Sequence, residues 1–303
     1  RNARAMGDRH WHVLGAGAIG CLFAARLNKG GHAVTLLLRE PPLDPELDLT
    51  LEDVNGVHHL QIAAQAVADG DDIDLLLVTT KAYDVAAAVV AVAHRLNARS
   101  QVILLANGLG FHQEVRARHP QLDLYSGTTT EGAYRLSPTH IRHAGRGFTR
   151  LGQAGCPRPT DWFHAWAGAI PESAWEEDIE QALWLKLAVN CAINPLTALH
   201  ACHNGRLLED DRLTADLRLL CQEIKQVSRA MGRVVGDLEQ VALQVVRDTA
   251  ENRSSMLQYL QAGRRTEIDY ITGHLVRIAA DHGVPTPFNA EILQRVKQLE
   301  SQS

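Results

Sequence analysis

The sequence predicts an α/β protein in which an N-terminal Rossmann-type domain with a parallel sheet precedes a C-terminal all-helical domain. In the first half, short apolar runs alternate with helix-length segments, which is typical of a parallel sheet covered by helices on both faces. A glycine-rich turn at residues 15–20 directly follows the first apolar run. From residue 176 onward the strand-like runs disappear and long helical periods replace them, which confines the sheet to the first half.

The elements of the first half follow from its apolar runs and from the helical periods between them. Strands are expected over residues 12–14, 33–38, 73–79, 102–105 and 122–126. Helices are expected over residues 18–29, over residues 85–96 and in a short stretch from residue 111. Turn-separated segments around residue 141 and over residues 148–151 indicate antiparallel strands at the edge of the sheet.

The second half should be helical throughout. Its helical periods cover residues 176–200, 211–231, 237–249, 264–282 and 289–299. Glycine and proline are poor residues for a helix interior, so the helices should break at Asn204-Gly205, Gly232, Gly263 and residues 285–287. We therefore predict two domains, formed by residues 1–175 and residues 176–303.

Composition favours a soluble cytoplasmic protein with a small-molecule partner. Of the 303 residues 46% are hydrophobic, and the formal net charge of −5 argues against a nucleic-acid partner. The apolar runs fall short of the roughly 20 residues of a membrane span, so no membrane is expected. Residues 1–9 lack the features of a secretory signal and indicate a frayed start or one added for expression. The sequence leaves open whether the protein is a monomer or a homodimer.

The cysteines and histidines indicate neither a disulfide framework nor a metal. Five cysteines are present without a C-x-x-C pair, which fits a reducing compartment. His200, Cys202 and His203 lie on one turn, which is poor geometry for chelation. We therefore expect no metal.

The sharpest motif is a glycine-rich turn at the first strand–helix junction. Its six residues are Gly15, Ala16, Gly17, Ala18, Ile19 and Gly20. Gly15 permits a tight turn, Gly17 lets the backbone approach a pyrophosphate, and Gly20 lets the helix pack closely on its strand. The free N–H groups of the helix N-terminus then favour phosphate oxygens. A turn without a ligand is the alternative, but the position in the chain indicates that these residues bind a dinucleotide.

The end of the second strand indicates which dinucleotide binds. An NAD enzyme usually places a carboxylate there for the ribose 2′-hydroxyl, whereas this strand ends in Arg39. A guanidinium suits the 2′-phosphate of NADPH, although Glu40 follows and a solvated surface charge is the alternative for Arg39. Lys81 lies at the same carboxyl edge, as a second phosphate contact or an exposed lysine. NADPH is therefore the expected cofactor.

Asn107 follows the next strand at this edge, in an Asn107-Gly108 pair. Its amide both donates and accepts hydrogen bonds, which suits the nicotinamide ribose or a substrate. An ordinary Asn-Gly turn is the alternative.

Lys186, Asn190 and Asn194 form a polar stripe on the helix expected over residues 176–200. Their i, i+4, i+8 spacing puts them on one helix face, and the positions between them are almost all apolar. A stripe on a buried helix needs partners inside the protein; the alternative is a face in water with a snorkelling lysine. Asparagine is a poor helix-interior residue, so its recurrence favours a functional role. Pro195 should bend the helix just after the stripe.

These side chains suit the reduction of a carbonyl group. Such a reaction needs a hydride donor on one side and a proton donor for the developing alkoxide on the other. A lysine whose pKa is lowered by burial can be that acid, while asparagines hold oxygens without adding charge. Residues 251–257 and 266–270 add hydroxyl, amide and carboxyl groups, although helix capping explains a serine pair and an early glutamate equally well.

Seven motifs, taken in order, resemble the ketopantoate reductase family. They are residues 15–20, the Asn107-Gly108 pair, and the stretches 127–130, 186–191, 193–198, 254–258 and 266–271. The resemblance spans nearly the whole chain and both predicted domains. One departure is Ala106, where the family has a histidine before the Asn-Gly pair.

The resemblance implies NADPH-dependent reduction of 2-dehydropantoate, a small 2-keto acid, to pantoate in pantothenate (vitamin B5) and coenzyme A synthesis. Residues 1–175 would hold NADP and residues 176–303 the substrate, with Lys186 as the proton donor. The implied substrate ligands are Asn107, Asn190, Asn194, Asn204 and Ser255. Glu267 would lie near the cofactor and orient the site, and Ala133 would offer its backbone to the nicotinamide. Asn107 would contact both ligands, and Asn204 is also a plausible helix C-cap.

Two other functions fit the same residues. A reductase of another branched 2-keto acid would share the fold and the cofactor motif, because these do not fix the substrate. A non-catalytic NADPH-binding sensor would use the helical domain as a partner surface, although the stripe that contains Lys186 argues against it.

Overall fold

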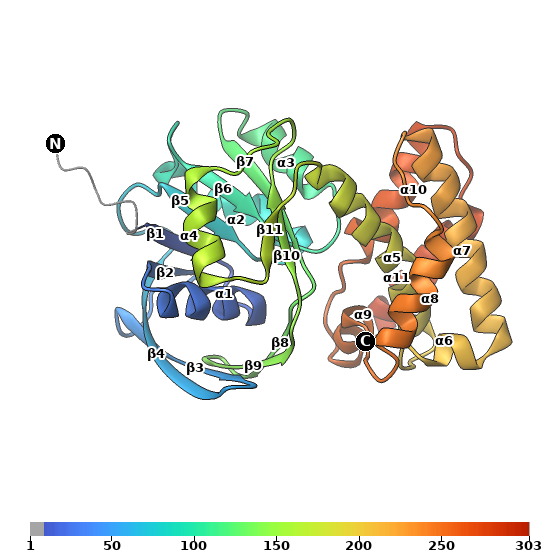
Figure 1. Ribbon diagram of the computed structural model, residues 1–303, viewed down its shortest axis with the longest axis horizontal. Helices are drawn as coiled ribbons and strands as arrows, with labels where there is room; N and C mark the ends of the chain where they lie inside the picture. Colours follow the sequence, from blue (N-terminus) through green and yellow to red (C-terminus); the bar gives the residue numbers. More distant parts are fainter. Residues whose placement is uncertain (1–8, 303) are drawn as a thin grey trace. The chain divides into compact units, whose positions relative to one another are not determined.

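The structure is a computed structural model that describes residues 9–302, so most of the predicted frayed start lies outside the described residues. The chain divides into two compact units. The sheet unit runs through Ala106 and resumes over Phe111–Glu180, and the helical unit comprises Asn107–Gly110 and the chain from Gln181 onward. The strands belong to the first unit and the long C-terminal helices to the second (Figure 1). The predicted α/β fold class is confirmed.

The division of the chain differs from the boundary predicted at residue 175. The Glu176 amide donates to the Leu151 carbonyl at 2.8 Å, and the Glu176 carboxylate accepts from Arg150 at 2.9 Å. These bonds hold the chain against the sheet beyond residue 175. The loop Asn107–Gly110 belongs to the helical unit, and within it the Leu109 amide donates to the Tyr270 carbonyl at 2.8 Å.

One 11-stranded sheet organises the sheet unit, in the order β11-β10-β7-β6-β5-β1-β2-β4-β3-β9-β8. Its parallel centre consists of β7 (Asp123–Thr129), β6 (Gln101–Leu104), β5 (Leu75–Val78), β1 (His10–Leu14) and β2 (Ala33–Leu38). The residues of β5 are all buried, as expected for a parallel strand that is covered on both faces. The predicted strands therefore form the middle of the sheet.

The hairpin of β3 (Glu46–Asp53) and β4 (Gly56–Ala66) was not predicted. Its residues alternate between the core and water, and its outward positions carry charged and polar side chains, so no continuous apolar run marks it. The later strands are β8 (Gly132–Ser137), β9 (His140–Gly145), β10 (Thr149–Gly152) and β11 (Ser173–Trp175). β9 and β10 confirm the antiparallel strands predicted near the sheet edges: β10 runs antiparallel to β7 and β9 antiparallel to β8, while β9 also pairs parallel with β3.

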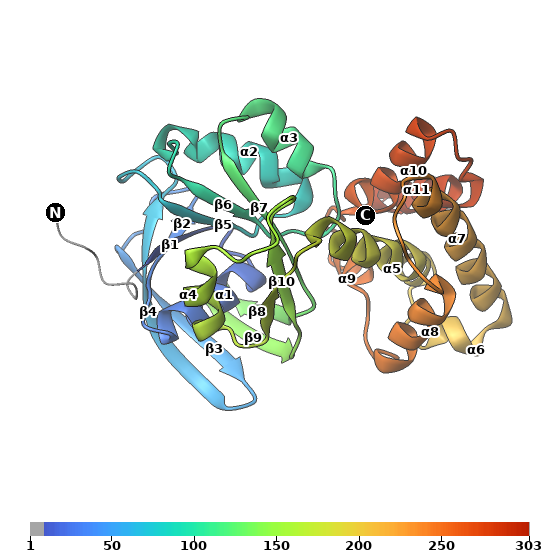
Figure 2. The same cartoon turned by 45° about the horizontal axis from the view of Figure 1, so that its top comes forward.

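Helices cover both faces of the central strands. α1 (Ala18–Lys29) and α4 (Asp161–Ala169) lie on one face, and α2 (Ala82–Val92) and α3 (Phe111–Arg118) on the other (Figure 2). α4 was not predicted; it adds Trp162 and Trp166 to the core, where both rings contact Trp11. Strands β4, β3, β9 and β8 curl around α1, so α1 is enclosed by the sheet (Figure 1).

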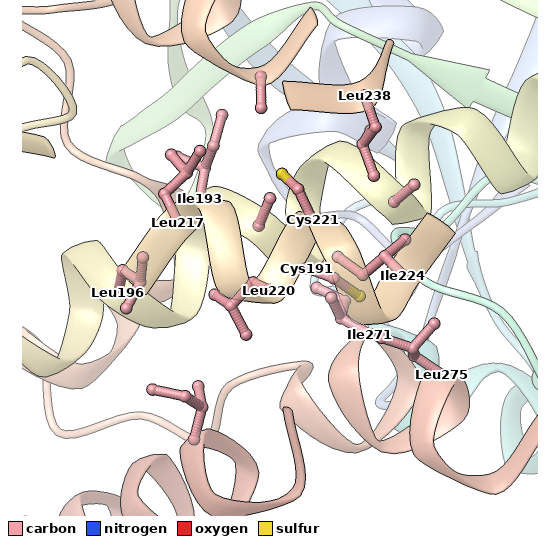
Figure 3. Close-up of a cluster of buried hydrophobic side chains, with 14 of the residues drawn as sticks. Cys191, Ile193, Leu196, Leu217, Leu220, Cys221, Ile224, Leu238, Ile271 and Leu275 are labelled. Carbon is pink, nitrogen blue, oxygen red and sulfur yellow. The ribbon is translucent and has the colours of Figure 1, made fainter. Parts of the chain in front are cut away.

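The helical unit is built around α5 (Ile179–Leu199). The other helices are α6 (Arg206–Glu209), α7 (Asp211–Ala230), α8 (Leu238–Asp248), α9 (Ser255–Gln261), α10 (Thr272–Asp281) and α11 (Pro287–Gln302). Figure 3 shows part of the core, where side chains of α5, α7, α8 and α10 gather. The predicted helix over residues 264–282 begins only at Thr272, after an irregular stretch and a 3-10 turn at Ile268–Tyr270, and α9 was not predicted.

α5 is long and apolar enough to cross a membrane by length and composition alone. However, 61% of its most apolar stretch is buried inside the protein, as in the core helix of a soluble protein. The helix continues through Pro195 to Leu199, although Pro195 has no N–H to donate to the Cys191 carbonyl.

Candidate cofactor and catalytic sites

The glycine-rich turn is packed so tightly that two of its positions have no room for a side chain. Gly15 has φ +107°, and a Cβ there would lie 2.7 Å from the Thr80 backbone nitrogen. A Cβ on Gly20 would overlap the Gly15 carbonyl and lie 2.5 Å from Thr79 Oγ1. Thr79 Oγ1 also donates to the Gly15 carbonyl at 2.8 Å. The end of β5 therefore holds the turn in place.

Gly17 differs from its neighbours because its space is open. A Cβ on Gly17 would meet no heavy atom of the described chain within 4 Å, so packing within the protein does not require glycine at this position. Gly17 is the N-cap of α1, and the first turn of this helix contains no acidic residue. The N–H groups and the positive dipole end of α1 are thus suited to an anion. Ala16, Ala18 and Ile19 complete this cradle, which fits the pyrophosphate of a dinucleotide.

The basic residues predicted to select NADPH lie at the carboxyl ends of β2 and β5. Arg39 is exposed and donates to the Asp84 carboxylate in the first turn of α2 at 3.2 Å. Lys81 is the N-cap of α2, and the Asp84 amide donates to its carbonyl at 2.8 Å. The Arg39–Asp84 ion pair therefore holds the guanidinium near the helix that Lys81 begins. Ala133 lies on β8 and packs against the core of the sheet unit.

In the helical unit, Lys186, Asn107 and Glu267 form a chain of hydrogen bonds. Lys186 Nζ donates to Asn107 Oδ1 at 3.2 Å, and Asn107 Nδ2 donates to Glu267 Oε2 at 3.5 Å. The loop that carries Asn107 belongs to this unit because it is fixed to Tyr270. It packs so closely there that a Cβ on Gly108 would collide with the Tyr270 carbonyl. The asparagine thus links an ammonium to a carboxylate through one amide.

Electrostatics prepares the Lys186 amine to exchange a proton near neutral pH. Burial lowers the pKa of Lys186 from its usual value to about 8, while the nearby Glu267 carboxylate opposes this shift. An amine with this pKa is mostly protonated at pH 7 and gives up its proton more readily than an exposed lysine. This is the behaviour required of a general acid.

Two family models match this chain. The model of ketopantoate reductase PanE/ApbA matches residues 11–155, and the model of its C-terminal region matches residues 178–300. The chain belongs to the ketopantoate reductase family. The two matches correspond to the sheet unit and the helical unit, respectively.

Relatives within the ketopantoate reductase family extend over the whole chain. A 2-dehydropantoate 2-reductase of Shigella flexneri is 38% identical over 298 residues, covering 96% of this chain and 95% of its own length. One of Archaeoglobus fulgidus is 33% identical over 296 residues, covering 95% and 97%. The crystal structure of a family member from Ralstonia eutropha JMP134 superposes with a TM-score of 0.88 at 26% identity, covering 97% and 99%.

The predicted substrate ligands of this chain occupy α5 and the segments after it. Asn190 and Asn194 are partly buried on the Lys186 face of α5, whereas Cys191 points into the core. Asn204 is buried and donates to Thr249 Oγ1 at 2.9 Å, while its Oδ1 has no hydrogen-bond partner in residues 9–302. Ser255 is the exposed first residue of α9.

Ser254, not Ser255, caps α9. Its hydroxyl accepts from the Leu257 amide at 3.2 Å and from Thr197 Oγ1 at 2.7 Å. Thr197 lies on α5 just after Asn194, so this bond fixes the start of α9 beside the polar stripe. Helix capping therefore explains Ser254, one of the two serines at positions 254 and 255.

Sequence reasoning missed several residues that shape the two sites. Thr79 and Thr80 support the glycine turn, and Asp84 holds Arg39. Arg135 of β8 donates to the carbonyl of Ala16 inside the turn. The Thr-Thr pair at the end of a strand was a visible signal, but nothing local indicated Arg135, which follows the turn by more than a hundred residues.

Proposed function

We propose that this protein reduces 2-dehydropantoate to pantoate with NADPH. The observation that carries the proposal is the partly buried Lys186 amine, whose pKa is about 8 and whose Nζ is held by Asn107. Membership of the ketopantoate reductase family and relatives named 2-dehydropantoate 2-reductase support the substrate. The glycine cradle and Arg39 support the cofactor.

In the proposed reaction, the glycine cradle and Arg39 would hold NADPH, which would supply the hydride for C2 of the keto acid. Lys186 donates a proton from Nζ to the carbonyl oxygen as negative charge develops on it. Asn107 orients the ammonium through its Oδ1, and the Glu267 carboxylate favours the protonated amine. The chain therefore provides an acid that is charged before reaction and neutral after it.

Uncharged polar side chains are proposed to bind the rest of the substrate. Asn190 and Asn194 lie one and two turns beyond Lys186 on the same helix face and would bind the hydroxyl and carboxylate oxygens. The buried Oδ1 of Asn204, without a partner in the described chain, would accept the substrate hydroxyl proton. Ser255 would donate its exposed hydroxyl to the carboxylate.

The decisive experiment is an NADPH-oxidation assay with 2-dehydropantoate and with other branched 2-keto acids. We expect the highest kcat/KM for 2-dehydropantoate. A higher value for another branched 2-keto acid would identify a different reductase of the same architecture. NADPH binding without turnover of any keto acid would favour the sensor instead.

We also propose that the enzyme works in the cytoplasm, as a monomer or homodimer. All five cysteines, Cys21, Cys156, Cys191, Cys202 and Cys221, are free, which suits a reducing compartment. Sedimentation equilibrium of the purified protein would determine its oligomeric state.

A further inference from the structure

Arg135 places a positive charge directly over the glycine turn. Its guanidinium, on strand β8, donates to the carbonyl of Ala16, the second residue of the turn. Burial raises the pKa of the Cys21 thiol in the first turns of α1, and a hydrogen bond from Arg135 opposes this rise. Both partners flank the helix N-terminus that is suited to phosphate.

The strand register explains why Arg135 points toward the turn. Ala133 pairs with His143 and Arg135 with Ile141, so both side chains lie on one face of β8. Ala133 on that face packs against the core of the sheet unit, whereas Tyr134 between them is exposed and accepts a hydrogen bond from Arg142. The curl of the sheet around α1 carries this face to the turn (Figure 1).

A buried ion network anchors β8 to α1 just before Arg135. Arg26 of α1 donates to the Glu131 carboxylate at 2.6 Å, and His143 Nε2 lies 2.6 Å from the other Glu131 oxygen. The Glu131 and His143 side chains are almost fully buried. The position of β8 relative to the turn is therefore fixed by the fold rather than by Arg135 itself.

We infer that Arg135 is a ligand of the cofactor pyrophosphate. Within residues 9–302 its hydrogen-bond partners are the Ala16 carbonyl and the Cys21 thiol, both uncharged, so no carboxylate cancels its charge. A guanidinium has five N–H donors in a planar fork, and two neutral partners leave donors for a phosphate oxygen. Arg39 differs, because the Asp84 carboxylate already pairs with it.

The inference rests on the proposed function only in requiring a dinucleotide at the glycine turn. The pyrophosphate is common to NADPH and NADH, whereas the 2′-phosphate is present in NADPH alone. Loss of Arg135 should therefore weaken the binding of both dinucleotides to the same extent. Loss of Arg39 should weaken the binding of NADPH selectively.

The test is a set of dissociation constants for NADPH and NADH, measured by titration calorimetry. Wild type is compared with Arg135→Ala, Arg135→Lys, Arg135→Gln and Arg39→Ala. Because hydrogen bonds to charged groups are the strong ones, Arg135→Ala should raise both dissociation constants about 10- to 100-fold. Arg135→Lys should recover part of this loss because it keeps the charge.

Arg135→Gln and the salt dependence separate the charge from a merely structural role. Glutamine retains an N–H donor for the Ala16 carbonyl but has no charge, so it should bind as weakly as alanine. The affinity of the neutral variants should also fall less steeply with salt than that of wild type. Arg142→Ala, on the neighbouring strand β9, is the matched control and should leave both dissociation constants unchanged.

Three results with the Arg135 variants would overturn the inference. Wild-type affinity in Arg135→Ala would show that Arg135 does not contact the pyrophosphate. Wild-type affinity in Arg135→Gln would show that Arg135 only supports the turn. A loss confined to NADPH would move the contact to the 2′-phosphate. If the wild-type protein binds neither dinucleotide, the proposed function is overturned as well. If the wild-type protein reduces the keto acid and the Arg135 variants bind both dinucleotides with wild-type affinity, only this inference is overturned.

Discussion

The glycine turn and the Lys186 cluster are built on opposite principles. The turn consists of six consecutive residues whose backbone is the functional part, and its tightest positions tolerate no added atom. The cluster consists of side chains, and its hydrogen bonds join residues 79 and 160 positions apart in the chain. A site of the first kind should fail when atoms are added, and a site of the second kind when they are removed.

The largest effect is expected from Lys186→Ala. Removing the proton donor should lower kcat by about 10²- to 10⁴-fold, the usual contribution of a general acid, while NADPH binding at the glycine turn persists. Steady-state kinetics and calorimetric NADPH titration measure the two effects. Lys225→Ala on α7 is the control and should leave kcat unchanged. Retention of wild-type kcat in Lys186→Ala would show that Lys186 is not the proton donor.

Gly17→Ala should have the opposite signature. A methyl group there meets no protein atom within 4 Å, so the melting temperature should not change, but it would occupy the space through which the pyrophosphate approaches. We expect the NADPH dissociation constant to rise about tenfold or more. Gly168→Ala on α4, also with open space around its Cβ, is the control. Unchanged affinity in Gly17→Ala would show that the pyrophosphate does not pass this close to the turn.

The pH dependence should report the electrostatics of the cluster. Lys186 must be protonated to act as an acid, and its pKa is lowered to about 8. The kcat/KM for keto acid reduction should therefore be level just below pH 8 and fall about tenfold per pH unit above it. A profile that stayed level to pH 10 would indicate an ordinary solvated lysine.

Glu267→Gln should give the smallest effect, a shift in the pH at which kcat/KM begins to fall, which is the alkaline limb of the profile. The Glu267 carboxylate raises the pKa of Lys186 against burial, so its neutralisation should lower the pKa further and move the limb to lower pH. The pH profile of kcat/KM measures this shift. Glu291→Gln on α11, whose carboxylate is exposed, should leave the limb in place. A shift to higher pH in Glu267→Gln would contradict the assigned sign.

What could be predicted from the sequence follows the same contrast. The turn was predicted because strand, glycines and helix are contiguous, and the α5 stripe because helical spacing is a local property. The hairpin of β3 and β4 was missed because its alternating residues form no apolar run, and α4 was missed as well. The compact sheet unit extends to Glu180 rather than ending at the predicted residue 175, and the bonds between Glu176 and β10 that hold this stretch are not visible in the sequence.

The sequence by itself determined the α/β class, the position of the glycine turn and the shared face of Lys186, Asn190 and Asn194, since each depends on residues a few positions apart. Only the tertiary structure decided that Asn107 and Glu267 join Lys186 and that Arg135 reaches Ala16. Such meetings depend on the curl of a sheet and the packing of helices, which many dispersed contacts set together. Local periodicity carries no record of those contacts.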